Sequence, residues 1–117
     1  MTTVTTSSRE LAHPRREEIT LEAVLHALAD PMRLRVVREL AASGAEFPCS
    51  HFPLPVSKST TTHHFRVLRE AGVIRQHYRG TAKYSRLRED DLDALFPGLV
   101  LSVLAAAAAE EARRAAP

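Results

Sequence analysis

The stretch Ser57–Gly72 constrains the fold of this chain more than any other part of the sequence. Ser57 is suited to the N-cap of a helix, because its hydroxyl oxygen can accept a hydrogen bond from a free backbone N–H of the first turn. Gly72 can adopt the left-handed conformation that ends many helices. Between them, a stripe at helical spacing can be buried, and it consists of Thr61, Phe65 and Leu68. The stretch therefore predicts an amphipathic helix over residues 57–71.

The outer face of this predicted helix carries short hydroxyl and cationic side chains. They gather on its first turns: Ser57, Lys58, Ser59, Thr60, Thr62, His63 and Arg66. Hydroxyl, lysine and arginine groups can donate hydrogen bonds to phosphate oxygens, and a lysine or arginine can also address guanine O6 and N7. We therefore expect this helix to enter the major groove of double-stranded DNA.

Two further helices are predicted upstream. Thr20 is expected to cap the first, whose apolar face comprises Leu21, Val24, Leu25 and Leu28. Asp30-Pro31 combines a capping residue with a proline preorganised for the first helical position, so a second helix is expected to begin there. Its inner stripe is predicted to be Leu34, Val37 and Leu40, with Arg33, Arg35 and Arg38 pointing outward, and Ser43-Gly44 is expected to end it. The three prolines of residues 45–56 then exclude a long helix.

A β-hairpin is predicted over residues 75–88, because two β-compatible runs flank Gly80. The hairpin is strongly basic, with Arg75, Arg79, Lys83, Arg86 and Arg88. Charged residues on a hairpin also protect strand edges from aggregation. Beside a hydroxyl-rich helix, however, the cluster favours contact with nucleic acid.

The two ends of the chain are predicted to lie outside this central unit. Residues 1–17 are interpreted as a flexible tail, solvated or touching phosphates through Arg9, Arg15 and Arg16. Asp90 is expected to cap a short helix, and Pro97-Gly98 to separate it from a long alanine-rich helix. The predicted division is therefore a tail (1–17), a DNA-binding domain (18–96) and a C-terminal dimerisation helix (97–117).

Composition narrows the class of protein. A chain of 117 residues with 44% hydrophobic residues suits one small globular domain. The net charge is only +2, so the placement of the basic residues matters more than their number. A single cysteine suits a reducing compartment. No secretory signal is recognisable, and the apolar run at residues 94–109 falls short of a membrane span. We expect a cytoplasmic protein that does not enter a membrane.

Three segments carry a closer likeness to a known family: LADPMRLRVVREL (Leu28–Leu40), SKSTTTHHFRVLREAGVI (Ser57–Ile74) and RGTAKYSRL (Arg79–Leu87). Together they resemble the ArsR/SmtB family of small bacterial repressors. The resemblance implies a mainly α-helical winged helix-turn-helix with a small β-hairpin wing. It also implies a homodimer that binds operator DNA and releases it when an inducer, often a metal ion, binds. The dimer interface would involve residues 21–28 and 99–112. On the wing, the residues expected to follow the DNA backbone or minor groove are Arg79, Thr81 and Lys83.

The metal sites familiar from that family are missing or incomplete here. Where metal-sensing members often carry a CxC motif, this chain reads EFPCSHFPLP, with Cys49 alone. The terminal helix has Glu110 and Glu111 but no histidine. Cys49 and His51 are weak metal candidates, since two ligands are too few. Adjacent His63 and His64 diverge around a helix, so His63 is expected to face DNA and His64 to pack or cap. No cofactor is predicted, and the inducer remains unassigned.

The sequence also bears on classes of function other than an inducible repressor. An enzyme is disfavoured, because no catalytic triad, phosphate-binding glycine loop or paired carboxylates are recognisable. A winged-helix protein-interaction module would bind DNA weakly and without salt dependence, and the basic wing argues against it. Cys49 could instead make the chain a thiol-redox-sensing repressor, or could be an ordinary buried cysteine. A repressor without any small-molecule inducer, regulated by its abundance, also stays open.

Overall fold

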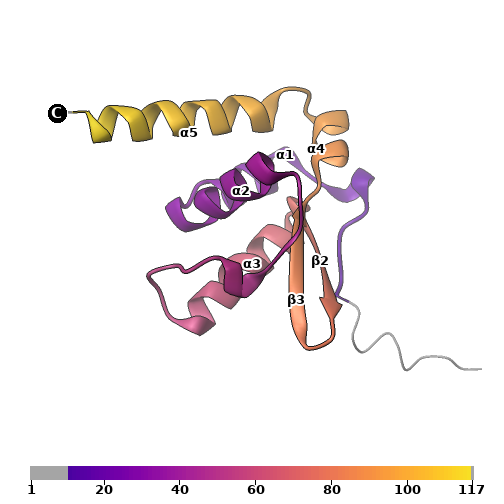
Figure 1. Ribbon diagram of the computed structural model, residues 1–117. Helices are drawn as coiled ribbons and strands as arrows, with labels where there is room; N and C mark the ends of the chain where they lie inside the picture. The colour runs from indigo at the N-terminus through magenta and orange to yellow at the C-terminus, as the bar shows by residue number, and fades with distance from the viewer. Residues whose placement is uncertain (1–10, 117) are drawn as a thin grey trace, which may run out of the picture.

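The computed structural model describes residues 11–116, which form five α-helices and a small antiparallel sheet, with the last helix lying alongside the second and away from the sheet (Figure 1). The helices are α1 (Leu21–Leu28), α2 (Pro31–Ser43), α3 (Lys58–Glu70), α4 (Glu89–Leu95) and α5 (Leu99–Ala115). The strands are β1 (Phe47–Pro48), β2 (Ile74–Arg79) and β3 (Ala82–Leu87), and two short 3-10 turns are η2 (Arg16–Glu18) and η3 (Cys49–His51). This is the predicted mainly α-helical architecture with a small β wing.

Local capping signals explain where the first three helices begin. The Asp30 carboxylate accepts hydrogen bonds from the backbone N–H groups of Met32 and Arg33 at 2.9 and 3.1 Å. The hydroxyl oxygens of Thr20 and Ser57 each accept one from the backbone N–H three residues later, at 3.3 and 3.2 Å. These contacts satisfy donors that the first turn of a helix leaves free. The predicted starts of α1, α2 and α3 are confirmed.

The start of α4 differs from the prediction. Its N-cap residue is Arg88, which makes no side-chain cap, and the expected cap Asp90 lies inside the first turn. Two neighbouring acidic residues share that turn, so the favourable interaction with the helix dipole is spread over three carboxylates. The predicted break at Pro97-Gly98 is confirmed, since Gly98 has φ +78° immediately before α5.

The turn after α3 requires glycine for two reasons. Gly72 has φ +86°, a conformation that costs little only without a side chain. A Cβ atom at this position would also lie 2.5 Å from Cγ1 of Ile19. The close approach lets Ile19 join the core beside the start of β2.

The sheet has the order β1-β3-β2, with antiparallel pairing throughout. The predicted hairpin is confirmed, with Gln76 opposite Ser85 and the turn at Gly80. Strand β1 lies in the segment expected to be irregular, where Phe47 pairs with Ser85. A two-residue strand has too short a pattern to be recognised in a sequence, so tertiary pairing defines it.

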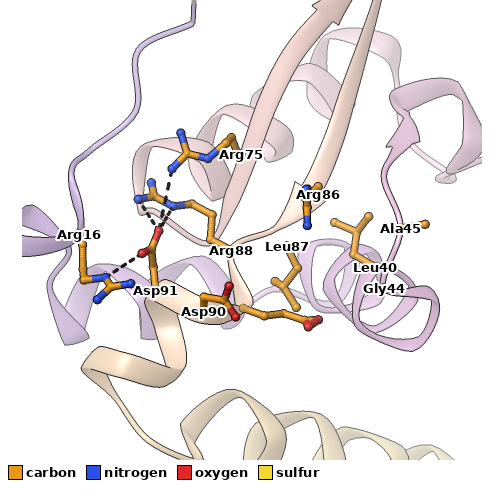
Figure 2. Close-up of a pocket in the computed structure, with 11 residues that line it drawn as sticks. Arg16, Leu40, Gly44, Ala45, Arg75, Arg86, Leu87, Arg88, Asp90 and Asp91 are labelled. Atoms are coloured by element: carbon orange, nitrogen blue, oxygen red, sulfur yellow. Dashed lines mark hydrogen bonds and ion pairs between the residues drawn. The ribbon is translucent and has the colours of Figure 1, made fainter.

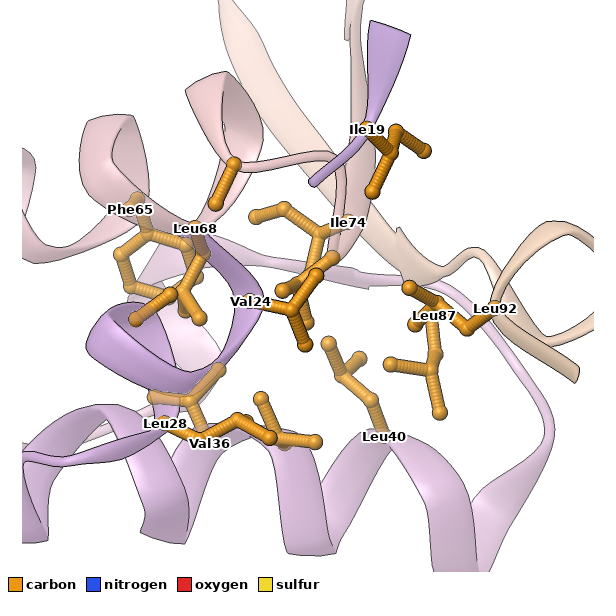
Figure 3. Packing of buried hydrophobic residues seen from close by; sticks show 14 of the residues in the cluster. Ile19, Val24, Leu28, Val36, Leu40, Phe65, Leu68, Ile74, Leu87 and Leu92 are labelled. Carbon is orange, nitrogen blue, oxygen red and sulfur yellow. The ribbon is translucent and has the colours of Figure 1, made fainter. Parts of the chain in front are cut away.

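The core lies between the helices and the inner face of the sheet (Figure 3). Its largest fully buried side chains include Val24, Leu40, Leu68, Ile74 and Leu92. Several positions of the predicted stripes are not buried, including Leu21, which is 43% exposed. Leu25 is 44% exposed, and Val36 rather than Leu34 is fully buried on α2. Arg33, expected to point outward, is only 7% exposed.

Part of the predicted N-terminal tail, including Arg9, falls outside the described residues. Residues 11–17 do not project as a free tail, because they contact the body of the protein. The Pro14 carbonyl accepts a hydrogen bond from Arg88, and Arg16 forms an ion pair with Asp91 at 2.8 Å. Arg16 is therefore engaged within the chain.

Within residues 11–116, no single helix is long and apolar enough to cross a membrane. Helices α4 and α5 reach that length and composition only together, and they bend by 106° at the break between them.

Candidate nucleic-acid interface

Helix α3 presents the predicted polar face to solvent. All seven side chains expected to meet DNA are exposed: Ser57, Lys58, Ser59, Thr60, Thr62, His63 and Arg66. The opposite face is buried through His64, Phe65 and Leu68. The hydroxyl groups at the start of the helix also order one another, since Ser57 Oγ lies 2.9 Å from Thr60 Oγ1 and 3.2 Å from Ser59 Oγ.

The wing brings a second basic element to the same side of the molecule. In Figure 1, α3 and the turn between β2 and β3 both lie on the side away from α5. Thr81 is exposed and Lys83 half-buried. The Arg79 guanidinium lies 4.3 Å from the centroid of the Tyr84 ring and donates a hydrogen bond to the Glu46 carboxylate. Arg79 therefore has an internal partner that a phosphate group would have to replace.

Arg33 links the helices that support α3, a role that the sequence patterns missed. Its guanidinium donates to the carbonyl oxygens of Ala27 at 2.8 Å and His26 at 3.3 Å, and lies 3.1 Å from Nδ1 of His64. The signal was present in the sequence: α1 ends only two residues before α2 begins, so the last carbonyls of α1 need a nearby donor. His64 is buried, as the packing interpretation expected.

Gln76 is a second buried polar residue that the patterns missed. It is 2% exposed and contacts Arg69 of α3 and Ser85 of β3. Strand alternation could have found it, because it shares the inner face of β2 with Ile74.

The weak metal candidates Cys49 and His51 do not form a recognisable site. The His51 ring stacks on Phe47 with centroids 4.0 Å apart, and its Nε2 lies 3.6 Å from a Glu39 carboxylate oxygen. Among residues 11–116, no group of three or more histidine, cysteine, aspartate or glutamate side chains could hold a metal ion. Burial raises the pKa of the Cys49 thiol, which disfavours the thiolate that a redox sensor needs.

A cavity of about 320 Å³ lies at the opposite end of the hairpin from its turn (Figure 2). Asp91 lines one side of it and contacts Arg88 at 2.9 Å, Arg16 at 2.8 Å and Arg75 at 3.9 Å. Hydrogen bonds from Arg16 and Arg88 hold the pKa of Asp91 below its ordinary value. Because one carboxylate already engages three guanidinium groups, this cluster joins η2, β2 and α4 to one another.

Comparison with known proteins identifies the class. A helix-turn-helix domain family matches residues 28–77, the range from the end of α1 into β2. An uncharacterised helix-turn-helix transcriptional regulator of Bacillus subtilis (strain 168), YceK, is 35% identical over 79 residues. That alignment covers 66% of this chain and 79% of the relative. The chain belongs to the helix-turn-helix transcriptional regulators.

Solved structures of ArsR-type regulators share this fold. An ArsR family transcriptional regulator has a TM-score of 0.59 at 24% identity, covering 70% of this chain and 90% of that one. A possible transcriptional regulator for arsenical resistance has a TM-score of 0.54 at 29% identity, covering 78% and 97%. The repressor BigR of Xylella fastidiosa has a TM-score of 0.51 at 24% identity, covering 65% and 85%. The predicted ArsR-type resemblance is confirmed.

These findings define the general function. The protein is a DNA-binding transcriptional regulator, and regulators of this class are not enzymes.

Proposed function

We propose that this regulator is a homodimeric repressor that binds operator DNA through residues 57–71 and the wing at residues 75–88. The observation that carries the proposal is the two-sided character of α3: its buried face anchors it to the core, while its exposed face consists of hydroxyl and cationic groups. The expected contacts are the seven exposed side chains of residues 57–66 together with Arg79, Thr81 and Lys83. A repressor of this kind acts on operator DNA in the chromosome, so we expect the protein to be cytoplasmic.

Exposed apolar residues on the terminal helices support dimerisation. Leu21 and Leu25 on α1 are 43% and 44% exposed, and Leu101 on α5 is 73% exposed. A second copy of the chain would cover them, with residues 97–117 as the dimerisation helix and residues 18–96 as the DNA-binding domain. Two symmetry-related α3 helices would then read half-sites about 34 Å apart, or a multiple of that distance. Repression is supported by one structural neighbour, which is described as a transcriptional repressor.

The test is fluorescence anisotropy of the purified protein with the intergenic DNA upstream of its own gene, over a salt series. Tight binding that weakens steeply with salt is expected, because phosphate contacts release counterions. Binding that is weak and indifferent to salt would contradict the proposal and favour a protein-interaction module. Parallel titrations with Zn(II), As(III) and peroxide examine the inducer. If one of them releases the protein from DNA, that compound is the signal. If none does, the repressor is controlled by another ligand or by its abundance.

Single substitutions test the assigned residues. Arg66→Ala and Lys83→Ala are each expected to weaken operator binding and to lower the slope of log K against log salt by about one unit. Arg113→Ala is the matched control, because Arg113 is an exposed cation on the last turn of α5, far from α3. Unchanged operator binding in both Arg66→Ala and Lys83→Ala would overturn the site assignment.

A further inference from the structure

The two basic elements are joined by a partly buried polar contact in addition to the backbone. Arg69 lies on the last turn of α3, and its Nη1 donates a hydrogen bond to Gln76 Oε1 on β2 at 2.7 Å. The Gln76 Nε2 group donates in turn to Ser85 Oγ on β3 at 3.0 Å. Gln76 and Ser85 are 2% and 0% exposed. One amide side chain therefore connects the helix to both strands of the wing.

The position of Gln76 makes an apolar residue the expected choice. It shares the inner face of β2 with fully buried Ile74. Burying an amide costs free energy unless each polar atom finds a partner. Here the carbonyl oxygen and the amino group are both used, and the Gln76 backbone N–H donates to His13 Nε2 at 2.9 Å. Hydrogen bonds weaken steeply when their angle departs from the preferred range, so this contact restrains the angle between the two elements.

The backbone turn sets the approximate angle, because the N–H groups of Gly72 and Val73 donate to the carbonyl oxygens of Arg69 and Leu68 at 3.0 Å, and the side-chain contact adds a constraint beyond this turn. Only residues 71–73 separate α3 from β2, and the turn is made at Gly72. The Arg69 side chain also depends on this contact, because its buried Nε has no partner among residues 11–116. Without Gln76, the end of α3 and the wing would still be close but would lack a directional contact between their side chains.

We propose that Gln76 is a positioning residue, which holds the wing at a fixed angle to α3 so that both elements engage one DNA duplex together. The proposal rests on the proposed function, since it takes α3 and the wing as the two DNA-contacting elements. The consequence is energetic coupling between the two contacts. A wing contact strengthens operator binding only when the Arg69–Gln76 contact holds the wing at its angle to α3.

A thermodynamic cycle measures this cooperation. The cost of Lys83→Ala in operator affinity is compared between the natural chain and the Arg69→Met variant, at a temperature where both are folded. Contacts that act together show coupling of about three- to tenfold in affinity. The Lys83→Ala cost is expected to fall by that factor in the Arg69→Met background. Arg69→Lys keeps a cation that can reach Gln76 and is expected to restore the full cost.

The matched control is Arg35→Met on α2, which removes an exposed cation away from the wing. It is expected to leave the Lys83→Ala cost unchanged. Gln76→Leu tests the amide itself. If that variant does not fold, Arg69→Met still tests the contact, because Arg69 is partly exposed and its replacement disturbs the core less. Equal Lys83→Ala costs in the natural and Arg69→Met backgrounds would overturn the proposal, since a contact with only a general stabilising role would not alter the coupling.

A second measurement needs no DNA. Residual dipolar couplings of backbone amides in the free protein report the orientation of β2 and β3 relative to α3. In the Arg69→Met variant, the couplings of the wing are expected to shrink relative to those of α3, because the wing samples several angles. Unchanged couplings would contradict the proposal. If the natural chain fails to bind operator DNA while the couplings respond as expected, the proposed function fails, and what stands is only that Gln76 fixes the angle between the wing and α3.

Discussion

At the scale of single residues, Arg33 shows how a buried cation can use each of its three nitrogens in a contact with a neutral group. A guanidinium only donates hydrogen bonds, so the 3.1 Å contact with His64 Nδ1 requires that this nitrogen accept. The same His64 nitrogen lies 3.9 Å from an Asp30 carboxylate oxygen. Through this contact and the carbonyls of Ala27 and His26, Arg33 attaches α3 to the end of α1.

Replacement of Arg33 is expected to destabilise the fold. Arg33→Met leaves buried carbonyl and imidazole acceptors without a donor and is expected to lower the free energy of unfolding by about 2–4 kcal/mol. Arg33→Lys supplies one donor nitrogen, so its free energy of unfolding is expected to lie between those of the natural chain and Arg33→Met. Urea denaturation followed by circular dichroism measures the change. Arg35→Met, an exposed neighbour on α2, is expected to stay within about 0.5 kcal/mol of the natural chain. Equal losses of unfolding free energy in Arg33→Met and Arg35→Met would show that the Arg33 contacts contribute little.

His13 gives the fold a predictable dependence on pH. Its Nε2 accepts a hydrogen bond from the Gln76 backbone, so the bond requires the neutral ring. Burial, followed by the nearby charge of Arg75, lowers the pKa of His13 from its ordinary value of 6.5. The unfolded chain then binds a proton more readily than the folded one. The stability that His13 contributes is complete above pH 6.5 and is lost as the pH falls through the lower folded-state value.

The measurement is the urea midpoint at pH 7.5 and pH 5.5, in the natural chain and in His13→Gln. A glutamine can accept the same hydrogen bond but does not titrate. The natural chain is expected to lose more stability on acidification than the variant does, and comparing the two removes the effect of the other histidines. An identical loss in both chains would rule out His13 as the source.

At the scale of elements, the sequence predicted what short-range chemistry determines. Thr20, Asp30 and Ser57 are capping residues whose partners lie within three positions, so the starts of three helices could be found. The failures at Arg33, Gln76 and β1 share another cause, because their partners lie on other elements. Gln76 meets Arg69 seven residues away, and Arg33 meets His64 thirty-one residues away. The exposed face of α3 was predictable because it needs no partner within the chain.

Glu46 lies outside the wing, and if the wing contacts DNA as proposed, the Glu46 carboxylate would compete with a phosphate group for Arg79. Glu46, just before β1, accepts a hydrogen bond from Arg79 and lies 3.6 Å from Nε2 of His77. Glu46→Gln removes a negative charge beside the wing and releases Arg79. Affinity for DNA at low salt is expected to rise about two- to threefold, and the gain should shrink as salt screens the charge. Anisotropy titrations at two salt concentrations measure it.

The control for this change is Glu39→Gln on α2, a carboxylate that also faces a histidine, His51, at 3.6 Å but lies outside the wing. No change in affinity is expected for it. Weaker binding in Glu46→Gln would mean that Glu46 orients Arg79 for DNA instead of competing with it.

At the scale of the whole molecule, α5 is the element least enclosed by its own chain. It runs alongside α2 and extends beyond it (Figure 1). None of its described residues is fully buried, and an ion pair of 2.9 Å between Arg38 and Glu111 joins its distal part to α2. Leu101 is 73% exposed, a poor arrangement for an apolar side chain in water. A second copy of the chain would remove this apolar surface from solvent.

Leu101→Glu is therefore expected to convert a dimer into a monomer, because a carboxylate in an apolar interface is costly to desolvate. Sedimentation equilibrium measures the change. Ala106→Glu is the control, since Ala106 is exposed about 140° around the helix from Leu101.

The DNA result separates dimerisation from local damage. Two linked half-sites raise affinity by about 10²–10⁴, so Leu101→Glu should lose that factor on a palindromic operator. Binding of each protomer to a single half-site should keep its affinity and salt slope, because α3 and the wing are untouched. Loss of half-site binding as well would mean that α5 supports the DNA-binding domain itself.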